Sequence, residues 1–236
     1  MFQVRKYVAF SLVLCAAVTA GTMLLSRLGT ASAVWAAEKA APVVIIDPGH
    51  GGEDGGATSV TGLRESGLNL EISLRINDYL HFLGIETSMI RDTDISVCTE
   101  GDTIAQRKVS DIHNRVQLTE NIPNGILLSI HQNYFTEAQY RGAQIFYAPT
   151  DESRELALSM QEMIASQVDP RNHRESKPAR DIYLMEHVTC PAVLVECGFL
   201  SNYEEEQLLR NPDYQKKLAA ALGCCIFQFL EARNEV

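Results

Sequence analysis

Wholly apolar runs alternate along the chain with segments in which apolar residues recur every three or four positions. The first run, Val43–Ile46, leads into Asp47-Pro48-Gly49, which is typical of a buried strand that ends in a tight turn. A glycine-rich stretch follows at 51–67, and from Leu68 the apolar residues recur with the spacing of a helix, which Gly84 is expected to end. The apolar positions that share one face of this predicted helix are Leu68, Ile72, Ile76, Tyr79, Leu80 and Leu83.

The rest of the chain continues this alternation of strands and helices. Short apolar runs predict strands at 85–90, 126–130, 144–147 and 192–195. Helical periodicity and capping signals predict helices at 104–120, at 151–168, after Ser201-x-x-Glu204 and from Pro212 onward. Such alternation indicates an α/β fold, with a twisted, largely parallel sheet flanked by helices on both faces.

The N-terminal segment differs from the rest of the chain. Arg5 and Lys6 precede an uncharged run at 7–26, and Ala31-Ser32-Ala33 is typical of a cleavage site for a signal peptidase. A run of about 20 residues could also just cross a bilayer as a helix. For residues 1–33, a signal peptide and a membrane anchor therefore both stay open, followed by a linker at 34–42 and one folded domain at 43–236. In either case, the folded domain is expected outside the cytoplasmic membrane, as an anchored or a secreted protein.

Composition and charge exclude several classes of protein. Hydrophobic residues make up 46% of the 236 residues, enough for a core but too few for a polytopic membrane protein. The formal net charge of −10 repels phosphate backbones, so no nucleic acid is expected as a partner. The six cysteines form no CxxC pair, which excludes a cysteine-rich zinc site, and their spacing suggests no disulfide framework.

Polar residues with metal-binding chemistry come at or just after the ends of the apolar strands. They are His50, His131 and Glu196, and Glu65 falls in the glycine-rich loop after the first strand. Because ligands bind outside the carboxyl ends of strands in open α/β sheets, these residues can converge on one rim. Two imidazoles and one carboxylate make a catalytic zinc shell with an open position, and a second carboxylate can accept a proton from water.

Four segments, in this order, resemble the zinc-dependent N-acetylmuramoyl-L-alanine amidase family. They are Val44–Gly52, Gly62–Glu65 with Asn69-Leu70, Ser129–Asn133 and Val195–Asn202, and the resemblance covers roughly 43–232. It implies a zinc site at the carboxyl ends of the strands, with one Zn²⁺ per chain. The residues matching the family's ligand positions are His50, Glu65 and His131, and the residue matching its catalytic carboxylate is Glu196. It also implies that Arg91 and Asp94 frame the site structurally and that Arg115 matches an arginine before the third strand, so both arginines are interpreted as structural.

The activity implied by the resemblance is hydrolysis of the amide between N-acetylmuramic acid and L-alanine in peptidoglycan. Within the family, the chain is most similar to the sporulation type, which takes part in forming muramic-δ-lactam in the spore cortex and hence in germination. Peptidoglycan would be the main partner, together with the membrane if residues 1–33 stay attached and with an unidentified activator or sporulation protein. The location would be the cell wall or the forespore intermembrane space. Gln132 and an insert at 97–108 depart from the wider family pattern.

Several alternatives stay open at this point. One is a zinc carboxypeptidase that acts on stem peptides, and another is a catalytically inactive wall-binding module. Cys197 adjoins Glu196, but neighbouring side chains on a strand point to opposite faces, which argues against a cysteine nucleophile. A basic loop at 171–180 is either a solvated turn or the place where Arg174 or Arg180 binds a stem carboxylate.

Overall fold

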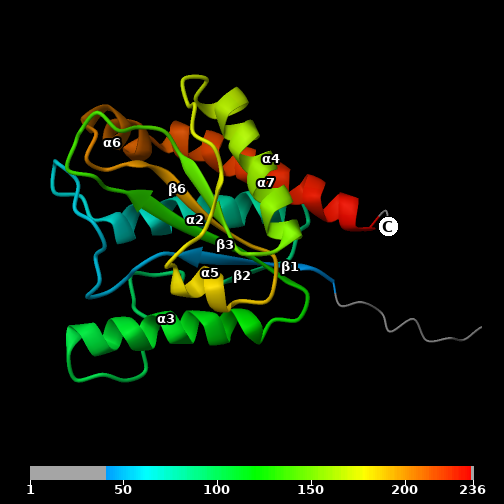
Figure 1. Cartoon of the computed structure of the whole chain (residues 1–236), viewed down its shortest axis with the longest axis horizontal. Coiled ribbons are helices and arrows are strands. Elements are labelled where there is room, and N and C mark those ends of the chain that lie inside the picture. The colour runs from blue at the N-terminus through cyan, green and yellow to red at the C-terminus, as the bar shows by residue number, and fades with distance from the viewer. Residues whose placement is uncertain (1–40, 235–236) are drawn as a thin grey trace, which may run out of the picture. The chain divides into compact units, whose positions relative to one another are not determined.

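The computed structural model describes residues 41–234, and within them six strands form one sheet in the order β2-β1-β3-β6-β4-β5 (Figure 1). The strands are β1 (Val43–Pro48), β2 (Thr87–Met89), β3 (Gly125–Asn133), β4 (Gln144–Tyr147), β5 (Lys177–Pro178) and β6 (Ala192–Phe199). All neighbours run parallel except β4 and β6, which confirms the largely parallel sheet.

Helices cover both faces of this sheet, as the sequence predicts (Figure 1). One face packs against α2 (Glu65–Phe82), α4 (Asp151–Met163), α6 (Tyr203–Arg210) and α7 (Pro212–Asn234). The other face packs against α3 (Ile104–Glu120) and α5 (Tyr183–His187). None of these described helices is long and apolar enough to span a bilayer. The predicted signal or anchor at 1–33, and the linker up to residue 40, lie outside the described residues.

The apolar runs of the sequence are the central strands, which are buried on both sides. On β1, Val44 and Ile46 pack towards α2 and α7, whereas Ile45 packs towards α3 and α5, and all three side chains have 0% exposure. Helices cover both faces of a central parallel strand, so consecutive residues of the strand are apolar instead of alternating between apolar and polar. Because β1, β3 and β6 pair in parallel, their carboxyl ends lie at one edge of the sheet.

The helix predicted at 151–168 is helical over that range, but its type changes along the way, and one other predicted helix boundary is wrong. The segment is α-helical to Met163, and Ile164–Val168 forms a π-helical turn that Asp169 closes by donating its backbone N–H to the Ile164 carbonyl. The capping residue of α6 is Asn202 rather than Ser201. The Ser201 hydroxyl instead accepts a hydrogen bond from the backbone N–H of Phe135, at 3.2 Å, so it serves the loop after β3.

The segment 171–180 is not wholly a loop. It contains β5, a two-residue strand that pairs with β4 at the edge of the sheet. Pro178 within β5 has no N–H to offer, and an edge strand is where a sheet tolerates proline. Local sequence cannot reveal so short a strand, because two residues carry no periodicity.

Candidate metal centre

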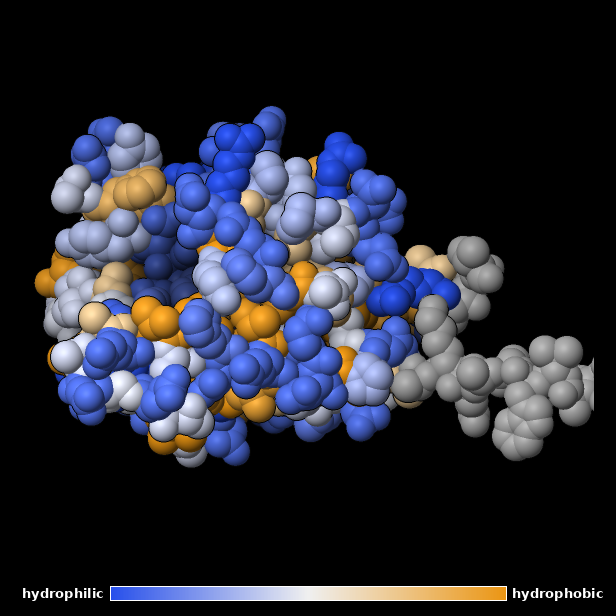
Figure 2. Space-filling view, turned by 60° about the horizontal axis from the view of Figure 1, so that its bottom comes forward, coloured by the Kyte–Doolittle hydropathy of each residue, from blue (hydrophilic) through white to orange (hydrophobic). Residues whose placement is uncertain are grey.

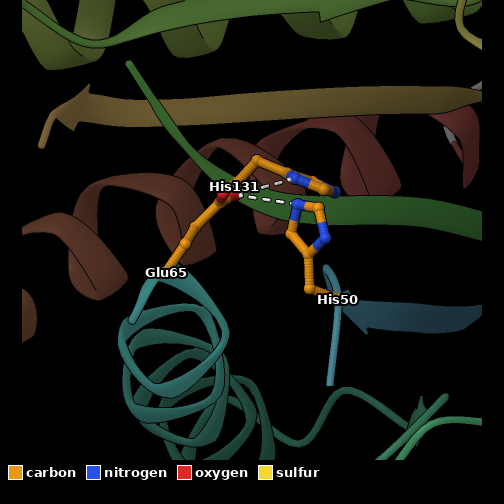
Figure 3. Close-up of side chains that lie close together, drawn as sticks. All are labelled: His50, Glu65 and His131. Carbon is orange, nitrogen blue, oxygen red and sulfur yellow. Dashed lines mark hydrogen bonds and ion pairs between the residues drawn. The ribbon is translucent and has the colours of Figure 1, made fainter. Parts of the chain in front are cut away.

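Three side chains from distant parts of the sequence meet at the carboxyl ends of β1 and β3 (Figure 3). His50 follows β1, His131 lies near the end of β3, and Glu65 is the first residue of α2. The sequence pattern instead predicts Glu65 in the preceding loop. The helix starts earlier than predicted because apolar periodicity marks only the turns that pack on the core, whereas the first turn of α2 presents its buried carboxylate to the two imidazoles.

The spacing of these groups fits a single tetrahedral ion. Glu65 Oε1 lies 3.3 Å from His50 Nε2 and 3.1 Å from His131 Nδ1, and the candidate ligand atoms of the three residues all lie within 4.8 Å of one another. Zinc bonds to nitrogen and oxygen are about 2.1 Å long, which puts neighbouring ligands of a tetrahedral ion about 3.4 Å apart. The three side chains could therefore bind one zinc ion with little movement.

The electrostatics of the group also suit a cation. Burial disfavours the charged form of Glu65, yet its hydrogen bonds to both imidazoles hold the pKa of this carboxyl well below its usual range. Burial likewise disfavours a charged His50, but hydrogen bonds to Asp54 and Glu65 outweigh it and raise the pKa of His50 to about 9. The carboxylates thus stabilise positive charge at this place, which a metal ion would supply on neutral imidazoles.

The group is open to solvent on one side. The side chains of His50 and His131 are 26% and 21% exposed, whereas that of Glu65 is only 4% exposed. On the side of the molecule where the parallel strands end, at the left of both views, Figure 2 shows a hollow whose floor is hydrophilic. A ligand could therefore reach the two imidazoles, while Glu65 is held from within.

Glu196 lies beside this group on the next strand. It pairs with His131 across β3 and β6, so both side chains lie on the same face of the sheet. Its Oε2 is buried and has no hydrogen-bond partner among the described residues. Burial raises the pKa of Glu196 to about 7, opposed by the nearby His131 and reinforced by the charge of Glu65. A carboxyl group with a free oxygen and a pKa near neutrality can both accept and return a proton.

Backbone and amide groups fix the position of the Glu65 carboxylate. Its Oε1 accepts the backbone N–H of Gln132 at 3.1 Å and the side-chain amide of Asn69 at 3.3 Å, and its Oε2 accepts the backbone N–H of Ala57 at 2.9 Å. Glycine at position 49 is required here, because a Cβ atom would lie 2.2 Å from the ring of His131. The glycine-rich loop therefore lets the backbone approach the site closely.

Asp54 orients His50, a contact that the sequence pattern does not predict. Asp54 Oδ2 lies 2.8 Å from His50 Nδ1, which leaves Nε2 facing Glu65 and His131. The other oxygen of Asp54 lies 2.7 Å from Nζ of Lys108 on α3. The signal in the sequence for Asp54 is its position, a carboxylate four residues after the candidate ligand His50. No local sequence pattern predicts its contact with Lys108.

Two buried arginines frame the turn after β1, as expected from the sequence. Arg91 donates to the carbonyl oxygens of Pro48 at 2.8 Å and of Gly49 at 3.0 Å. Arg115 donates to the carbonyl of His50 at 2.7 Å and forms a buried ion pair with Asp47. Their planar guanidinium groups satisfy carbonyls that the sharp turn leaves without strand partners.

Cys197 points away from the candidate metal centre, as the alternation of side chains on β6 predicts. It is 1% exposed and packs in the core on the side of α2 and α7. Burial raises the pKa of its thiol far above the ordinary range. A buried neutral thiol is a poor nucleophile, so the cysteine alternative has no support in the structure.

The two candidate substrate-binding arginines lie in different surroundings. Arg174 is half-buried: it donates to the carbonyl of Arg141 at 2.7 Å and to Oε1 of Gln144 at 3.1 Å. Gln144 pairs with Glu196 across β4 and β6, so Arg174 lies near the rim. Arg180 is exposed between β5 and α5, and within 41–234 its side chain forms no hydrogen bond or ion pair. The structure brings neither arginine into contact with the three-residue group.

Comparison with protein families gives a match over nearly the whole described domain. Residues 44–227 match the model of a family described as N-acetylmuramoyl-L-alanine amidase. The chain belongs to this amidase family. The matched range contains the three candidate ligands and Glu196, so the geometry above lies within the part of the chain that matches the amidase family.

Individual amidases agree with this assignment in sequence and in structure. The chain is 34% identical over 203 residues to the germination-specific N-acetylmuramoyl-L-alanine amidase of Bacillus subtilis, covering 85% of each chain. It is similar to the CwlD amidase of Clostridioides difficile, solved in complex with the GerS lipoprotein, with a TM-score of 0.78 and 36% identity over 80% of this chain and 98% of that one. An N-acetylmuramoyl-L-alanine amidase from Clostridium difficile 630 gives a TM-score of 0.71 at 30% identity, covering 81% of this chain and 98% of that one.

Proposed function

We propose that this amidase hydrolyses the bond between N-acetylmuramic acid and L-alanine in peptidoglycan, and that it does so with one zinc ion bound by His50, Glu65 and His131. The observation that carries the proposal is the geometry of these three side chains, with ligand atoms within 4.8 Å of one another, beside the unpartnered carboxyl oxygen of Glu196. Two imidazoles and a carboxylate leave a fourth position of a tetrahedral ion open, which is the arrangement of catalytic rather than structural zinc.

Glu196 supplies the proton transfers in this proposal. When bound, zinc polarises the substrate carbonyl and lowers the pKa of a coordinated water. Glu196 accepts the proton of the attacking water and then donates it to the nitrogen of the departing L-alanine. An amine leaves only when protonated, so a single carboxyl group with a pKa of about 7 serves both steps. No covalent intermediate with the protein is needed.

Asp54 acts as a positioning residue for His50. A ligand imidazole commonly donates its second N–H to a carboxylate, which fixes the tautomer and the ring orientation. Asp54 accepts from Nδ1 at 2.8 Å and is itself held by Lys108, so Nε2 of His50 carries the lone pair towards the site. Asn69 and the backbone of Gln132 hold Glu65 in the same manner.

The decisive test separates metal binding from proton transfer. His131→Ala should lose zinc and activity together, whereas Glu196→Ala should keep zinc while its rate falls by at least ~10²-fold, the usual scale for a positioned acid–base group. Zinc content is measured by elemental analysis and the rate by release of peptides with a free L-alanine N-terminus. Full zinc and normal turnover in His131→Ala would contradict the ligand assignment, and loss of zinc from Glu196→Ala would make Glu196 a ligand.

Product analysis distinguishes the alternatives. Mass spectrometry of digested peptidoglycan should show intact stem peptides and glycan strands free of stems. A zinc carboxypeptidase would instead shorten the stems from their carboxyl ends and leave them attached to the sugar. An inactive wall-binding module would leave the polymer unchanged.

A role in the spore cortex follows from the similarity to the germination-specific relative. Removing the stem frees the lactyl group of muramic acid, which is the first requirement for muramic-δ-lactam. The amidase would act outside the cytoplasmic membrane, where peptidoglycan lies. Cortex from spores that lack the protein should contain no muramic-δ-lactam, and a normal lactam content would contradict this role. A lipoprotein partner, as in the complex of the similar CwlD amidase, is proposed on the same basis and is testable by co-purification from sporulating cells.

Recognition of the stem peptide is proposed for the basic segment 171–180. Stem peptides carry free carboxylates, which guanidinium groups bind through two parallel hydrogen bonds. Arg174 has the better position, because it contacts Gln144, the cross-strand neighbour of Glu196. Arg180 has the freer side chain, because none of its hydrogen-bonding groups is engaged within the described domain.

A further inference from the structure

Three large aromatic side chains stay exposed in the segment that follows β3. Tyr134, Phe135 and Tyr140 are 45%, 46% and 41% exposed, and residues 134–142 that carry them are called the aromatic loop below. Burying an aromatic ring is strongly favourable in water, so exposure of three within seven positions needs a reason. Clustered apolar exposure of this kind marks a binding surface more often than chance.

The rings of the aromatic loop form an ordered cluster. Phe135 and Tyr140 meet edge to face with centroids 5.2 Å apart, and both lie against Phe199, at 5.5 and 6.2 Å. Phe199 has 0% exposure, and the guanidinium of Arg174 stacks over its ring at 4.5 Å. Phe135 and Tyr140 thus pack against a buried ring while parts of both side chains remain exposed to solvent.

Hydrogen bonds from the region after β6 hold the aromatic loop in place. Ser201 accepts the backbone N–H of Phe135, and the side-chain amide of Asn202 donates to the carbonyls of Ala138 at 2.9 Å and Tyr140 at 3.3 Å. The buried carboxylate of Glu205 accepts the N–H groups of Gly142 and Phe199, each at 2.8 Å. The exposed rings therefore belong to a fixed backbone, which lowers the entropic cost of binding a ligand.

The aromatic loop borders the catalytic rim. Phe135 follows His131 by four residues, and Phe199 follows Glu196 by three residues on β6. Across β3 and β6, Glu196 pairs with His131 and Phe199 pairs with Asn133, with a register shift between the two pairs. Two residues of a strand span about 7 Å. The ring cluster therefore begins about 7 Å along the sheet from the residue that would transfer the proton.

We propose that Phe135 and Tyr140 bind sugar rings of the glycan strand next to the muramic acid whose amide is cut. This inference rests on the proposed function. The C–H groups on one face of a pyranose ring pack against an aromatic plane, whereas the stem peptide is charged and is matched by the basic segment 171–180. The aromatic loop adds affinity for polymer without touching the scissile bond, so it distinguishes a glycan strand from a single muropeptide.

The test compares variants that keep the packing on Phe199 but lose the flat ring. Phe135→Leu and Tyr140→Leu are such variants, Phe135→Tyr retains a plane, and Phe82→Leu is the control. Phe82 is 84% exposed at the far end of α2 from Glu65. Two probes are used with the zinc-loaded full-length protein: kcat/KM on polymeric peptidoglycan and on a monomeric muramoyl-peptide, and binding to glycan strands already stripped of stems.

Each leucine variant should raise KM on the polymer by ~3- to 10-fold, the scale of one aromatic contact, with kcat and the monomer reaction unchanged. Binding to stem-free glycan should weaken by a similar factor, whereas Phe135→Tyr and Phe82→Leu should match wild type. Wild-type binding and polymer KM in both leucine variants would overturn the proposal, as would an equal loss on the monomer. If the wild type cleaves neither substrate, the proposed function fails, but binding to stem-free glycan still decides whether the aromatic loop recognises sugar.

Discussion

Replacing Glu196 by glutamine should stabilise the zinc-free protein at pH 8 much more than at pH 5. Burial raises the pKa of Glu196 from an ordinary value of 4.5 to about 7. Between these values the folded protein holds a proton that the unfolded chain has already released. The group therefore reduces the free energy of unfolding as the pH rises towards 7, and a neutral glutamine of similar size removes that pH-dependent cost.

The size of this effect follows from the two pKa values. Their difference is 7 − 4.5 = 2.5, and at about 1.4 kcal/mol for each pH unit the full cost is about 3 kcal/mol. Part of this cost is already present at pH 5, and contact of the half-buried side chain with water reduces the cost further. We therefore expect the advantage of Glu196→Gln over wild type to be ~1–2 kcal/mol larger at pH 8 than at pH 5.

Urea unfolding in the presence of a zinc chelator measures this difference directly. Wild type and Glu196→Gln are unfolded at pH 5 and pH 8, and Glu204→Gln serves as the control because Glu204 is exposed on α6. The control should show no such change in advantage between the two pH values. An advantage of Glu196→Gln that is the same at both pH values, or larger at pH 5, would refute the reasoning that this carboxyl group is destabilised by burial.

Three further outcomes are expected. Asp54→Asn should weaken zinc binding by ~10- to 100-fold in a chelator competition, as loss of a carboxylate that orients a ligand does, while the neighbouring Glu53→Gln should not. Arg115→Met should lower the free energy of unfolding by ~3–5 kcal/mol in urea, because it leaves a buried carboxylate unpaired; a loss under 1 kcal/mol would contradict this. Arg174→Ala or Arg180→Ala should reduce kcat/KM on intact stems by ~10-fold with zinc retained, and less so at high salt. Wild-type kinetics in both, at low and high salt, would leave segment 171–180 as a solvated turn.

The layered fold and the meeting of the site residues could be read from the sequence because both depend on local patterns. A central parallel strand is apolar throughout, and a polar residue that ends it must lie at the carboxyl edge of the sheet. His50, His131 and Glu196 each follow or end such a run, so their convergence follows from the topology alone. The motifs then distinguished Glu65 from the other carboxylates, which periodicity could not do.

Only the tertiary structure decided which neighbours these residues have. The bond from Asp54 to Lys108, the place of Glu65 on a helix and the stacking of Arg174 on Phe199 all join positions whose contact no local pattern records. The pKa of Glu196 also depends on the tertiary structure, because burial in the folded chain and charged groups from other elements determine it. Hydrophobic patterning determines which face of an element is buried, whereas side-chain chemistry at the rim depends on distances that exist only after the layers have packed.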